Sequence, residues 1–238
     1  IIRLVKKKFS LTKVGHYGTL DPLASGVLPV AIGEATKTIH FISNNYKKYT
    51  FLAVWGKETD SCDAEGSVVK RSSVKPKTDD IELKIKKYFI GNILQKPPIF
   101  SAVKVKGQRA YNLARKNIKF ELEYKKIKIF DFQLIENEPK KYSKFKIKCS
   151  PGTYVRSVVR DLAYKLGTFA YASDIIRIES SFFNIDNSLN LQSIMTNSFQ
   201  SFSKILLPID FAIKNYPKIE IEKKYSDMIK HGKVIFIN

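Results

Sequence analysis

The sequence predicts an α+β fold, and two kinds of segment support that prediction. Several stretches alternate polar and apolar residues, as half-buried strands do, and others begin with capping residues and repeat apolar residues at helical spacing. With 238 residues, 44% of them hydrophobic, the chain can bury the core of one or two domains. These patterns fix the fold class but not the order of the strands.

The N-terminal half is predicted to hold two helices and two strands. Residues 1–8 have the pattern of the end of an amphipathic helix, and residues 46–56 alternate and are rich in β-formers. Residues 58–70 form an acidic, glycine-bearing loop that leads to a short strand. A second helix follows, which Thr78 or Asp79 can cap. Its expected core residues are Ile81, Ile85, Tyr88 and Phe89.

The C-terminal half continues this mixture. A proline-stiffened stretch leads to a short strand, a glycine turn and a helix over about 110–116. The stretches IKIFDFQLIEN and KFKIKCSPGTYV alternate like paired antiparallel strands. A helix over 157–167 ends at a glycine, and one further helical region extends over 189–208, where a proline ends it.

The charge of the chain is strongly positive, with 42 basic and 22 acidic residues and a formal net charge of +20. An excess of this size suits a polyanionic partner, and nucleic acid is the leading candidate. The alternative is a lysine-rich composition that comes from an AT-biased genome, because much of the excess is Lys. Charge alone does not decide between the two.

Compartment and metal signals point to an ordinary soluble protein. No run approaches the roughly 18 apolar residues that span a bilayer, and the N-terminal residues do not resemble a signal peptide. We therefore expect a cytoplasmic protein with no membrane partner. Cys62 and Cys149 lie far apart, and the histidines have no metal-ligand spacing. The sequence thus predicts neither a disulfide nor a metal site, and both cysteines are expected to be small buried residues.

Asp21 is the only acidic residue of the segment GHYGTLDPLASG. Because Pro22 follows it, Asp21 has the pattern of an N-cap that opens a helix. The glycines Gly15, Gly18 and Gly26 are more than a cap needs, and they would allow the backbone to approach something outside the protein. On the second interpretation this segment is a binding site.

Tyr49, in the predicted strand 46–56, also has two interpretations. It is either a strand tyrosine that packs on the core or a platform on which an unstacked base lies. In the second case Lys47 and Lys48 beside it would contact phosphate.

Arg156 belongs to the segment CSPGTYVRSVVRDL. Tyr154 and Arg156 alternate with Val155, which places both on one face of a strand end. Arg156 is then either an ordinary surface arginine or the partner of a carboxylate in a closed pocket. In the pocket it would keep that acid ionised and oriented.

Four segments together resemble the TruB-type tRNA pseudouridine synthases in order and spacing. They are GHYGTLDPLASGVLPVAIGEATK, KKYTFLAVWGKETDSCDAEG, QKPPIFSAVKVKGQRAYNLARK and CSPGTYVRSVVRDLAYKLG. The resemblance covers roughly residues 1–210, and the first segment is its most specific part.

This resemblance implies a pseudouridine synthase fold, with helices around a mixed, mainly antiparallel sheet. Residues 1–210 would be the catalytic domain without its N-terminal strand. Residues 211–238 would be the beginning of a PUA domain, a small RNA-binding domain that is incomplete here. The segment 174–183 is less basic than its counterpart in the family.

The implied activity is the isomerisation of uridine 55 in the TΨC loop of tRNA to pseudouridine. Asp21 aligns with the catalytic aspartate of the family, and Arg156 aligns with the arginine that pairs with it. One carboxylate near C1′ and C2′ of the ribose suits attack on C1′, attack on C6 or removal of the C2′ proton. The reaction involves no net redox change, so we expect no cofactor.

The substrate-binding residues that the resemblance implies surround the target base. Tyr49 aligns with the tyrosine that stacks on the base, and His16 aligns with the histidine that fills the gap left by the flipped nucleotide. Tyr154 lies in the same motif as Arg156. Ile175 takes the place of an apolar residue that lines the pocket.

The expected partner is tRNA, bound through its T-stem-loop by shape, and the expected working form is a monomer. Lysines and arginines in 104–116 and 125–128 would follow the RNA backbone. Two alternatives remain open: an RNA-binding module without catalysis, and a pseudouridine synthase that depends on a guide RNA.

Overall fold

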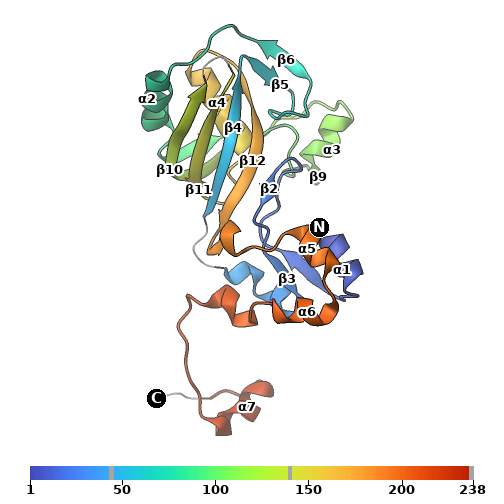
Figure 1. Cartoon of the computed structure of the whole chain (residues 1–238). Helices are drawn as coiled ribbons and strands as arrows, with labels where there is room; N and C mark the ends of the chain where they lie inside the picture. Colours follow the sequence, from blue (N-terminus) through green and yellow to red (C-terminus); the bar gives the residue numbers. More distant parts are fainter. Residues whose placement is uncertain (43–45, 139–140, 236–238) are drawn as a thin grey trace.

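A computed structural model of the chain describes residues 1–42, 46–138 and 141–235. Its centre is a seven-stranded sheet in the order β13-β12-β4-β11-β10-β7, with β2 beside β12 (Figure 1). The strands are β2 (Ser25–Gly26), β4 (Lys47–Trp55), β7 (Gly91–Gln95), β10 (Lys125–Glu138), β11 (Tyr142–Cys149), β12 (Ala170–Ser180) and β13 (Phe183–Asn184). Every pairing is antiparallel except that of β2 with β12. The predicted α+β class with a mixed, mainly antiparallel sheet is therefore confirmed.

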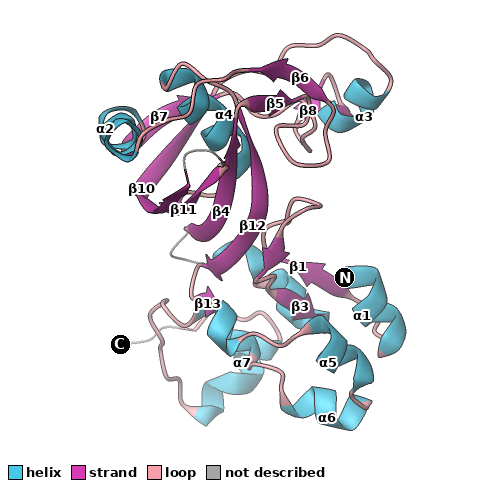
Figure 2. Cartoon of the chain, turned by 45° about the horizontal axis from the view of Figure 1, so that its top comes forward, coloured by secondary structure: helices cyan, strands magenta, loops and turns pink. Residues whose placement is uncertain are grey.

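The main core lies between one face of this sheet and two helices, α2 (Thr78–Tyr88) and α4 (Val155–Lys165) (Figure 2). Phe51 of β4 and Phe145 of β11 are at most 1% exposed, as are Ile81 of α2 and Val158 of α4. Because successive strand residues point to opposite faces, alternate residues of β4 and β11 enter this core. The pattern of residues 46–56 predicts this arrangement correctly.

Helix α2 differs from its prediction at both ends. It begins at Thr78 itself, Lys77 precedes it and no side chain caps it, so neither Thr78 nor Asp79 is the N-cap. Of the predicted core residues Ile81, Ile85 and Phe89 are buried, but Tyr88 is 36% exposed. The ammonium groups of Lys87 and Lys165 instead lie over the Tyr88 ring, 5.3 and 4.8 Å from its centroid, so the ring makes cation–π contacts at the surface.

The other elements are short and lie around the sheet. The strands are β1 (Val14–His16), β3 (Val30–Ile32), β5 (Lys57–Thr59), β6 (Val68–Arg71), β8 (Lys104–Val105) and β9 (Gln108–Arg109). The helices are α1 (Ile2–Lys8), α3 (Ala110–Arg115), α5 (Leu191–Thr196), α6 (Phe199–Lys204) and α7 (Ser226–Lys230). Strands β1 and β3 pair, as do β5 with β6 and β8 with β9, so the predicted acidic loop is bounded by a two-stranded ribbon.

A second, smaller core joins the N-terminal helix α1 to helix α6. Val5 and Phe9 of the N-terminal segment are buried against Phe202 of α6, and the rings of Phe9 and Phe202 stack with centroids 3.9 Å apart. The predicted single helical region over 189–208 is wrong, because Asn197 is extended and separates α5 from α6. Ser198 caps the new helix by accepting from the amide of Ser201.

The chain beyond residue 213 adds little to either core. Residues 214–235 are exposed at nearly every position, and α7 lies apart from the sheet in Figure 1. Residues 236–238, part of the predicted beginning of a PUA domain, lie outside the described residues. Within the described residues no helix combines the length and the apolar character needed to cross a bilayer.

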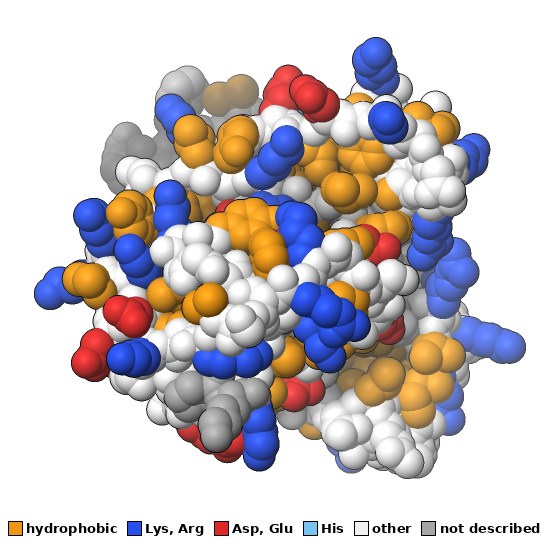
Figure 3. Space-filling model, turned by 90° about the horizontal axis from the view of Figure 1, so that it is seen from above, with side chains coloured by type: hydrophobic (Ala, Val, Ile, Leu, Met, Phe, Trp, Pro, Cys, Tyr) orange, Lys and Arg blue, Asp and Glu red, His pale blue; other side chains and the backbone are white. Residues whose placement is uncertain are grey.

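The surface reflects the basic composition. Figure 3 looks down on the top of the view in Figure 1, and Lys and Arg side chains are spread over that face with exposed hydrophobic side chains between them. The charge is thus distributed over the surface seen there, and the site must be located from specific contacts.

Candidate active site

Asp21 lies in a tight turn between β1 and β2. The amide of Ala24 donates to the Asp21 carbonyl oxygen at 2.9 Å, and β2 begins at the next residue. The N-cap interpretation is therefore wrong, because pairing of β2 with β12 draws the chain into the sheet after a single turn. The Asp21 side chain is 28% exposed and can be reached from solvent.

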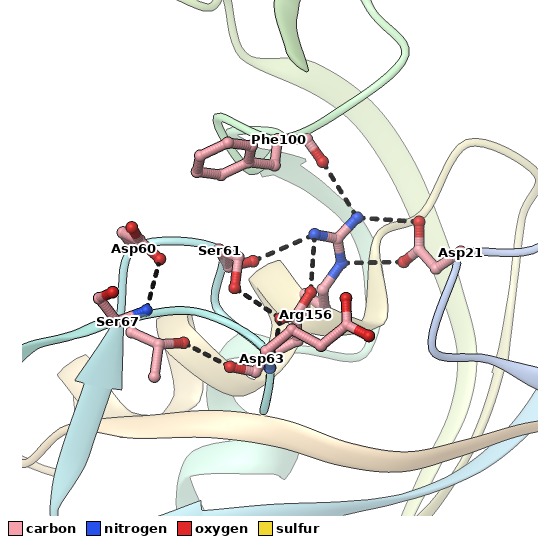
Figure 4. A network of polar contacts seen from close by, with 9 residues as sticks. Asp21, Asp60, Ser61, Asp63, Ser67, Phe100 and Arg156 are labelled. Atoms are coloured by element: carbon pink, nitrogen blue, oxygen red, sulfur yellow. Dashed lines mark hydrogen bonds and ion pairs between the residues drawn. The ribbon is translucent and has the colours of Figure 1, made fainter. Parts of the chain in front are cut away.

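Arg156 lies in the first turn of α4, and Tyr154 is the residue just before that helix. The prediction that both lie on one face of a strand end is wrong, because β11 stops at Cys149 and a Pro-Gly turn leads into the helix. The predicted pair with a carboxylate is present. Arg156 Nε donates to Asp21 Oδ2 at 2.9 Å, and Nη2 donates to Asp21 Oδ1 at 2.8 Å (Figure 4).

Every N–H group of the Arg156 guanidinium has an acceptor. Besides Asp21, Nη1 donates to the Ser61 carbonyl at 3.1 Å and to Asp63 Oδ2 at 3.2 Å. The second N–H of Nη2 donates to the Phe100 carbonyl at 3.2 Å. A guanidinium has five donors in a fixed plane, so five acceptors leave it one orientation. The carboxylate of Asp21 is held in a matching orientation.

Asp63 is a site residue that sequence reasoning missed. It lies in the loop between β5 and β6 and is 7% exposed. Its Oδ1 accepts from the Ser61 hydroxyl and from the amide of Glu65, which fixes the carboxylate against Arg156. The only available signal was an acidic loop in a basic chain, and that pattern alone is typical of a solvated turn.

The charge of Arg156 is stabilised by its two carboxylate neighbours. Burial alone would lower the pKa of Arg156, but the hydrogen bonds and charge of Asp21, with the charge of Asp63, raise it above the ordinary value. Because Arg156 is only 3% exposed, water screens this cluster weakly. The guanidinium therefore stays protonated at neutral pH.

Tyr49 lies on the core-facing side of β4, partly buried against the main core. Strand register places Arg177 of β12 opposite it. Burial raises the pKa of Tyr49 to about 12, although the Arg177 charge acts to lower it, so the ring is neutral. Asp21 is near enough for its charge to act on Tyr49, so the structure brings these two predicted residues into one region.

An open hollow of about 230 Å³ contains Asp21 and His16 in its wall. His16 Nε2 and Thr19 Oγ1 lie 3.0 Å apart, a hydrogen bond across the turn that carries Asp21. The remaining lining residues are Ile1, Ile2, Thr19, Leu20, Pro22, Ala24 and Leu28. The hollow is therefore apolar apart from Thr19 and the two predicted site residues.

The other two predicted binding residues are placed differently. Gln95 fixes the backbone of Tyr154 by two hydrogen bonds of 2.9 and 3.1 Å. Burial and then the charge of Asp21 raise the pKa of the Tyr154 phenol, so it too lies near the carboxylate. Ile175 is 3% exposed and belongs to the main core, so its side chain does not line the hollow.

Two glycines near Asp21 lie in close contact with residues of β4 and β12. Gly26 has a φ of +96°, and a Cβ there would collide with the Arg177 carbonyl oxygen. Gly18 has a φ of +71°, and a Cβ there would lie 2.8 Å from Lys47 Nζ. The expectation that these glycines serve something outside the protein is wrong for both, because they dock the loop on β4 and β12.

The two lysines beside Tyr49 are not an exposed phosphate site. Lys47 is 5% exposed and donates to the Ser180 hydroxyl at 2.6 Å. Lys48 points to the opposite face of the sheet and pairs with Glu179 at 3.0 Å. Successive strand residues cannot share a face, which the expectation for both lysines overlooked.

Both cysteines are free and buried, as predicted for Cys62 and Cys149. In the described part of the chain, no three His, Cys, Asp or Glu residues come together in a way that could hold a metal ion.

The fold is that of the pseudouridine synthases. The chain superposes on a protein of the structure described as a Cbf5-Nop10-Gar1 complex with a TM-score of 0.72 and 26% identity, over 97% of this chain and 62% of that one. A protein of the H/ACA RNP bound to a substrate RNA containing 2'-deoxyuridine shares the fold at a TM-score of 0.69 and 22% identity.

Within that class the chain belongs to the TruB family. Residues 6–155 match the family described as TruB family pseudouridylate synthase (N terminal domain). A tRNA pseudouridine synthase B of Clostridium tetani is 40% identical over 98% of this chain and 79% of its own length. A protein of the same name from Caulobacter vibrioides is 38% identical over 98% of this chain and 75% of its own length. The chain is thus an enzyme of the pseudouridylate synthase class.

Proposed function

We propose that this enzyme converts uridine 55 in the TΨC loop of tRNA to pseudouridine and that Asp21 acts at the sugar–base junction. One observation supports the role of Asp21: its carboxylate lines an open hollow and accepts two hydrogen bonds from Arg156, whose donors are all bonded. The tRNA substrate is supported by the names of the relatives from Clostridium and Caulobacter.

The chemistry requires one carboxylate that stays ionised. Breaking the glycosidic bond develops positive charge at C1′, and an oriented carboxylate stabilises that charge or forms a bond with a carbon of the substrate. Attack on C1′, attack on C6 and removal of the C2′ proton all start from the same aspartate. The N1–C1′ bond breaks, the uracil turns and C5 bonds to C1′. The proton of C5 leaves to solvent and N1 takes up a proton, so the product is an isomer of the substrate.

The target base must leave its stack before Asp21 can reach it. Extrusion costs a few kcal/mol, and stacking on an aromatic ring recovers about 1 to 3 kcal/mol. We propose that Tyr49 provides the ring, that His16 fills the vacancy in the RNA and that Tyr154 supports the base from the Arg156 side. Ile175 would act through the core behind Tyr49.

The tritium-release assay tests the role of Asp21. A T-stem-loop with tritium at C5 of uridine 55 loses its label when C5 bonds to C1′. Asp21→Asn should lower the single-turnover rate by about 10³-fold or more, because the nucleophile or base is gone. Asp60→Asn is the matched control, since Asp60 lies in the β5–β6 loop and bonds Ser67 instead of Arg156. An Asp21→Asn variant with wild-type tritium release would overturn the assignment.

The same assay separates the alternatives. A non-catalytic RNA-binding module releases no tritium, and a guide-dependent synthase releases none from a bare stem-loop. The relatives at 38 to 40% identity are named for tRNA, which supports tRNA as the substrate. A stem-loop that carries the labelled uridine at a different loop position tests whether position 55 is the one that is modified.

We further propose that residues 1–210 form the catalytic domain and that residues 211–238 begin a PUA domain. The exposure of residues 214–235 supports this, since a segment that packs on neither core is suited to join a separate unit. We also expect the enzyme to work as a monomer on tRNA in the cytoplasm.

A further inference from the structure

Lys47 is a buried cation whose role the proposed chemistry does not explain. It opens β4, two residues before Tyr49 and on the same face, and is 5% exposed. Strand register places Ser180 of β12 opposite it, and the Ser180 hydroxyl accepts from Lys47 Nζ at 2.6 Å. Burying an ammonium group is costly, so a lysine at this position needs a reason.

The ammonium group also contacts the loop that carries Asp21. Lys47 Nζ lies 3.7 Å from the ring centroid of Tyr17, a close cation–π contact. It packs against Gly18 so tightly that a Cβ there would lie 2.8 Å away. Tyr17 and Gly18 are four and three residues before Asp21 in the chain. Lys47 thus packs against the Tyr17–Gly18 turn that leads to Asp21.

No carboxylate neutralises Lys47 among the described residues. The charged or titratable groups that face it are Arg177 on β12, Cys149 on β11 and Tyr17 above it. Burial first, and then repulsion by Arg177, lower the pKa of Lys47 to about 7, and burial raises the pKa of Cys149 to about 12. The lysine therefore changes its charge near neutral pH, whereas Cys149 stays protonated.

We propose that Lys47 is a positioning residue for Asp21, and that only its cationic form, held between the Tyr17 ring and the Ser180 hydroxyl, keeps the Tyr17–Gly18 turn in the active geometry. The proposal rests on the proposed function of Asp21. A neutral amine loses the attraction of the Tyr17 ring, and the turn is then held by fewer contacts. Arg156 fixes the carboxylate end of Asp21, and Lys47 fixes the backbone that precedes it.

A lysine used only for stability would be a poor choice at this position. Replacing a buried charged group by an apolar side chain of similar size is often neutral or stabilising. Retaining Lys47 between β4 and the Asp21 loop is better explained by its effect on geometry. A shift of about 1 Å at a reacting group can reduce the rate by about 100-fold.

The test is the pH dependence of single-turnover tritium release at saturating T-stem-loop, between pH 6 and 8.5. The wild-type rate should fall as the pH rises through about 7, because the cationic form disappears. Lys47→Met should be slower at pH 6 by roughly 10-fold to 100-fold and should lack the alkaline fall. Lys47→Arg keeps its charge across this range, so it should retain more activity than Lys47→Met and also lack the fall.

The matched control is Lys146→Met, because Lys146 lies on β11 but faces away from the core and pairs in register with Thr50. It should keep the alkaline fall of the wild type. An alkaline fall that persists unchanged in both Lys47 variants would overturn the proposal. Wild-type protein that releases no tritium at any pH, by contrast, contradicts the proposed function itself.

A measurement without substrate keeps the two ideas separate. Amide hydrogen exchange over residues 14–21, at one fixed pH near 6, should be faster in Lys47→Met than in Lys146→Met if Lys47 holds the turn. Equal exchange in the two variants would show that the turn is held without Lys47 and would contradict the positioning role, whatever the activity of Asp21.

Discussion

At the scale of single residues, the site places one arginine between two carboxylates. Arg156 is nearly fully buried, yet each of its donors is bonded and its charge is opposed by Asp21 and Asp63. A buried charge is tolerated when it is paired and fully hydrogen-bonded. The two acids differ in exposure, because the Asp21 side chain is 28% exposed and that of Asp63 is 10% exposed. We infer that Asp21 faces the substrate and Asp63 holds the arginine.

Asp63→Asn should therefore slow the reaction without removing it. The amide keeps an acceptor for Arg156 but loses the charge, and hydrogen bonds to charged groups contribute about 1.5 to 3 kcal/mol. We expect a 10-fold to 100-fold lower single-turnover rate, far less than the loss in Asp21→Asn. Binding of the stem-loop, measured by filter retention, should change little. A loss as large as that of Asp21→Asn would mean that Asp63 itself contacts the substrate.

Lys47 gives a second prediction at this scale, now for stability. Its pKa is lowered from 10.5 to about 7 in the folded protein, so between these values the unfolded chain binds the extra proton. Stability then rises with pH, by about 1 kcal/mol per pH unit from this residue alone. Urea unfolding at pH 7.5 and 9 should show this rise in the wild type and a smaller one in Lys47→Met. Equal slopes would mean that Lys47 titrates at its ordinary pKa.

The sequence predicts the pair of Asp21 and Arg156 but not its surroundings. The pair follows from the family resemblance, since two residues 135 positions apart carry no local signal of contact. Asp63 and the burial of Lys47 depend on which loop and which strand face meet, and only the tertiary structure fixes that. The strand-end prediction for Tyr154 and Arg156 fails because alternation over three residues is too short to distinguish a strand from a helix start.

At the scale of elements, the site depends on the parallel contact of β2 with β12. This strand pair is only two residues long, yet it anchors the turn that carries Asp21. The amide of Val27 donates to the Arg177 carbonyl at 2.8 Å, and the Arg177 guanidinium donates to the carbonyls of Val27 and Gly18. One buried arginine therefore clamps both ends of the loop.

Gly26→Ala should break this contact. The residue has a φ of +96°, and its new Cβ would meet the backbone of Arg177, which cannot rotate away. Gly33→Ala is the matched control, because Gly33 also has a positive φ of +58° but open space around it. Strain of this kind costs about 1 to 3 kcal/mol in both variants, and the collision adds to it only in Gly26→Ala. We expect a lower urea midpoint and slower tritium release for Gly26→Ala than for Gly33→Ala. Equal midpoints would show that β2 can move.

Element patterns predict three of the four long strands and some of the short ones, but miss β12, which has eleven residues. β4, β10 and β11 each cover eight or more residues, so their alternation is unambiguous. β2 has two residues and no pattern of its own. The Asp21-Pro22 pair before it therefore looks like the start of a helix, because nothing in the sequence indicates a strand there. The split between α5 and α6 is missed because a serine within a helical pattern gives no signal that distinguishes a cap from a helical residue.

At the scale of the whole molecule, the charge of +20 is the property that a polyanionic substrate would meet first. The hairpin of β8 and β9 with α3 lies on one side of the sheet and α2 on the other (Figure 1). Lys104 and Lys106 of the hairpin are exposed, and so are Lys86 and Lys87 of α2. The two pairs carry equal charge, so they can separate a local RNA contact from a general electrostatic effect.

If the T-stem-loop lies along the hairpin, replacing Lys104 and Lys106 by Gln should weaken binding and flatten its salt dependence. Each phosphate contact that is lost lowers the slope of log affinity against log salt concentration by about 0.7 to 0.9. Measured between 50 and 300 mM salt, the slope for the double variant should therefore be smaller by about 0.7 to 1.8. The lower value applies if one lysine contacts phosphate and the upper value if both do. The Lys86 and Lys87 double variant should keep the wild-type slope, because a charge more than a Debye length of about 10 Å from the RNA is screened. Equal losses of slope in the two double variants would mean that binding depends on net charge alone and that the RNA does not contact the hairpin.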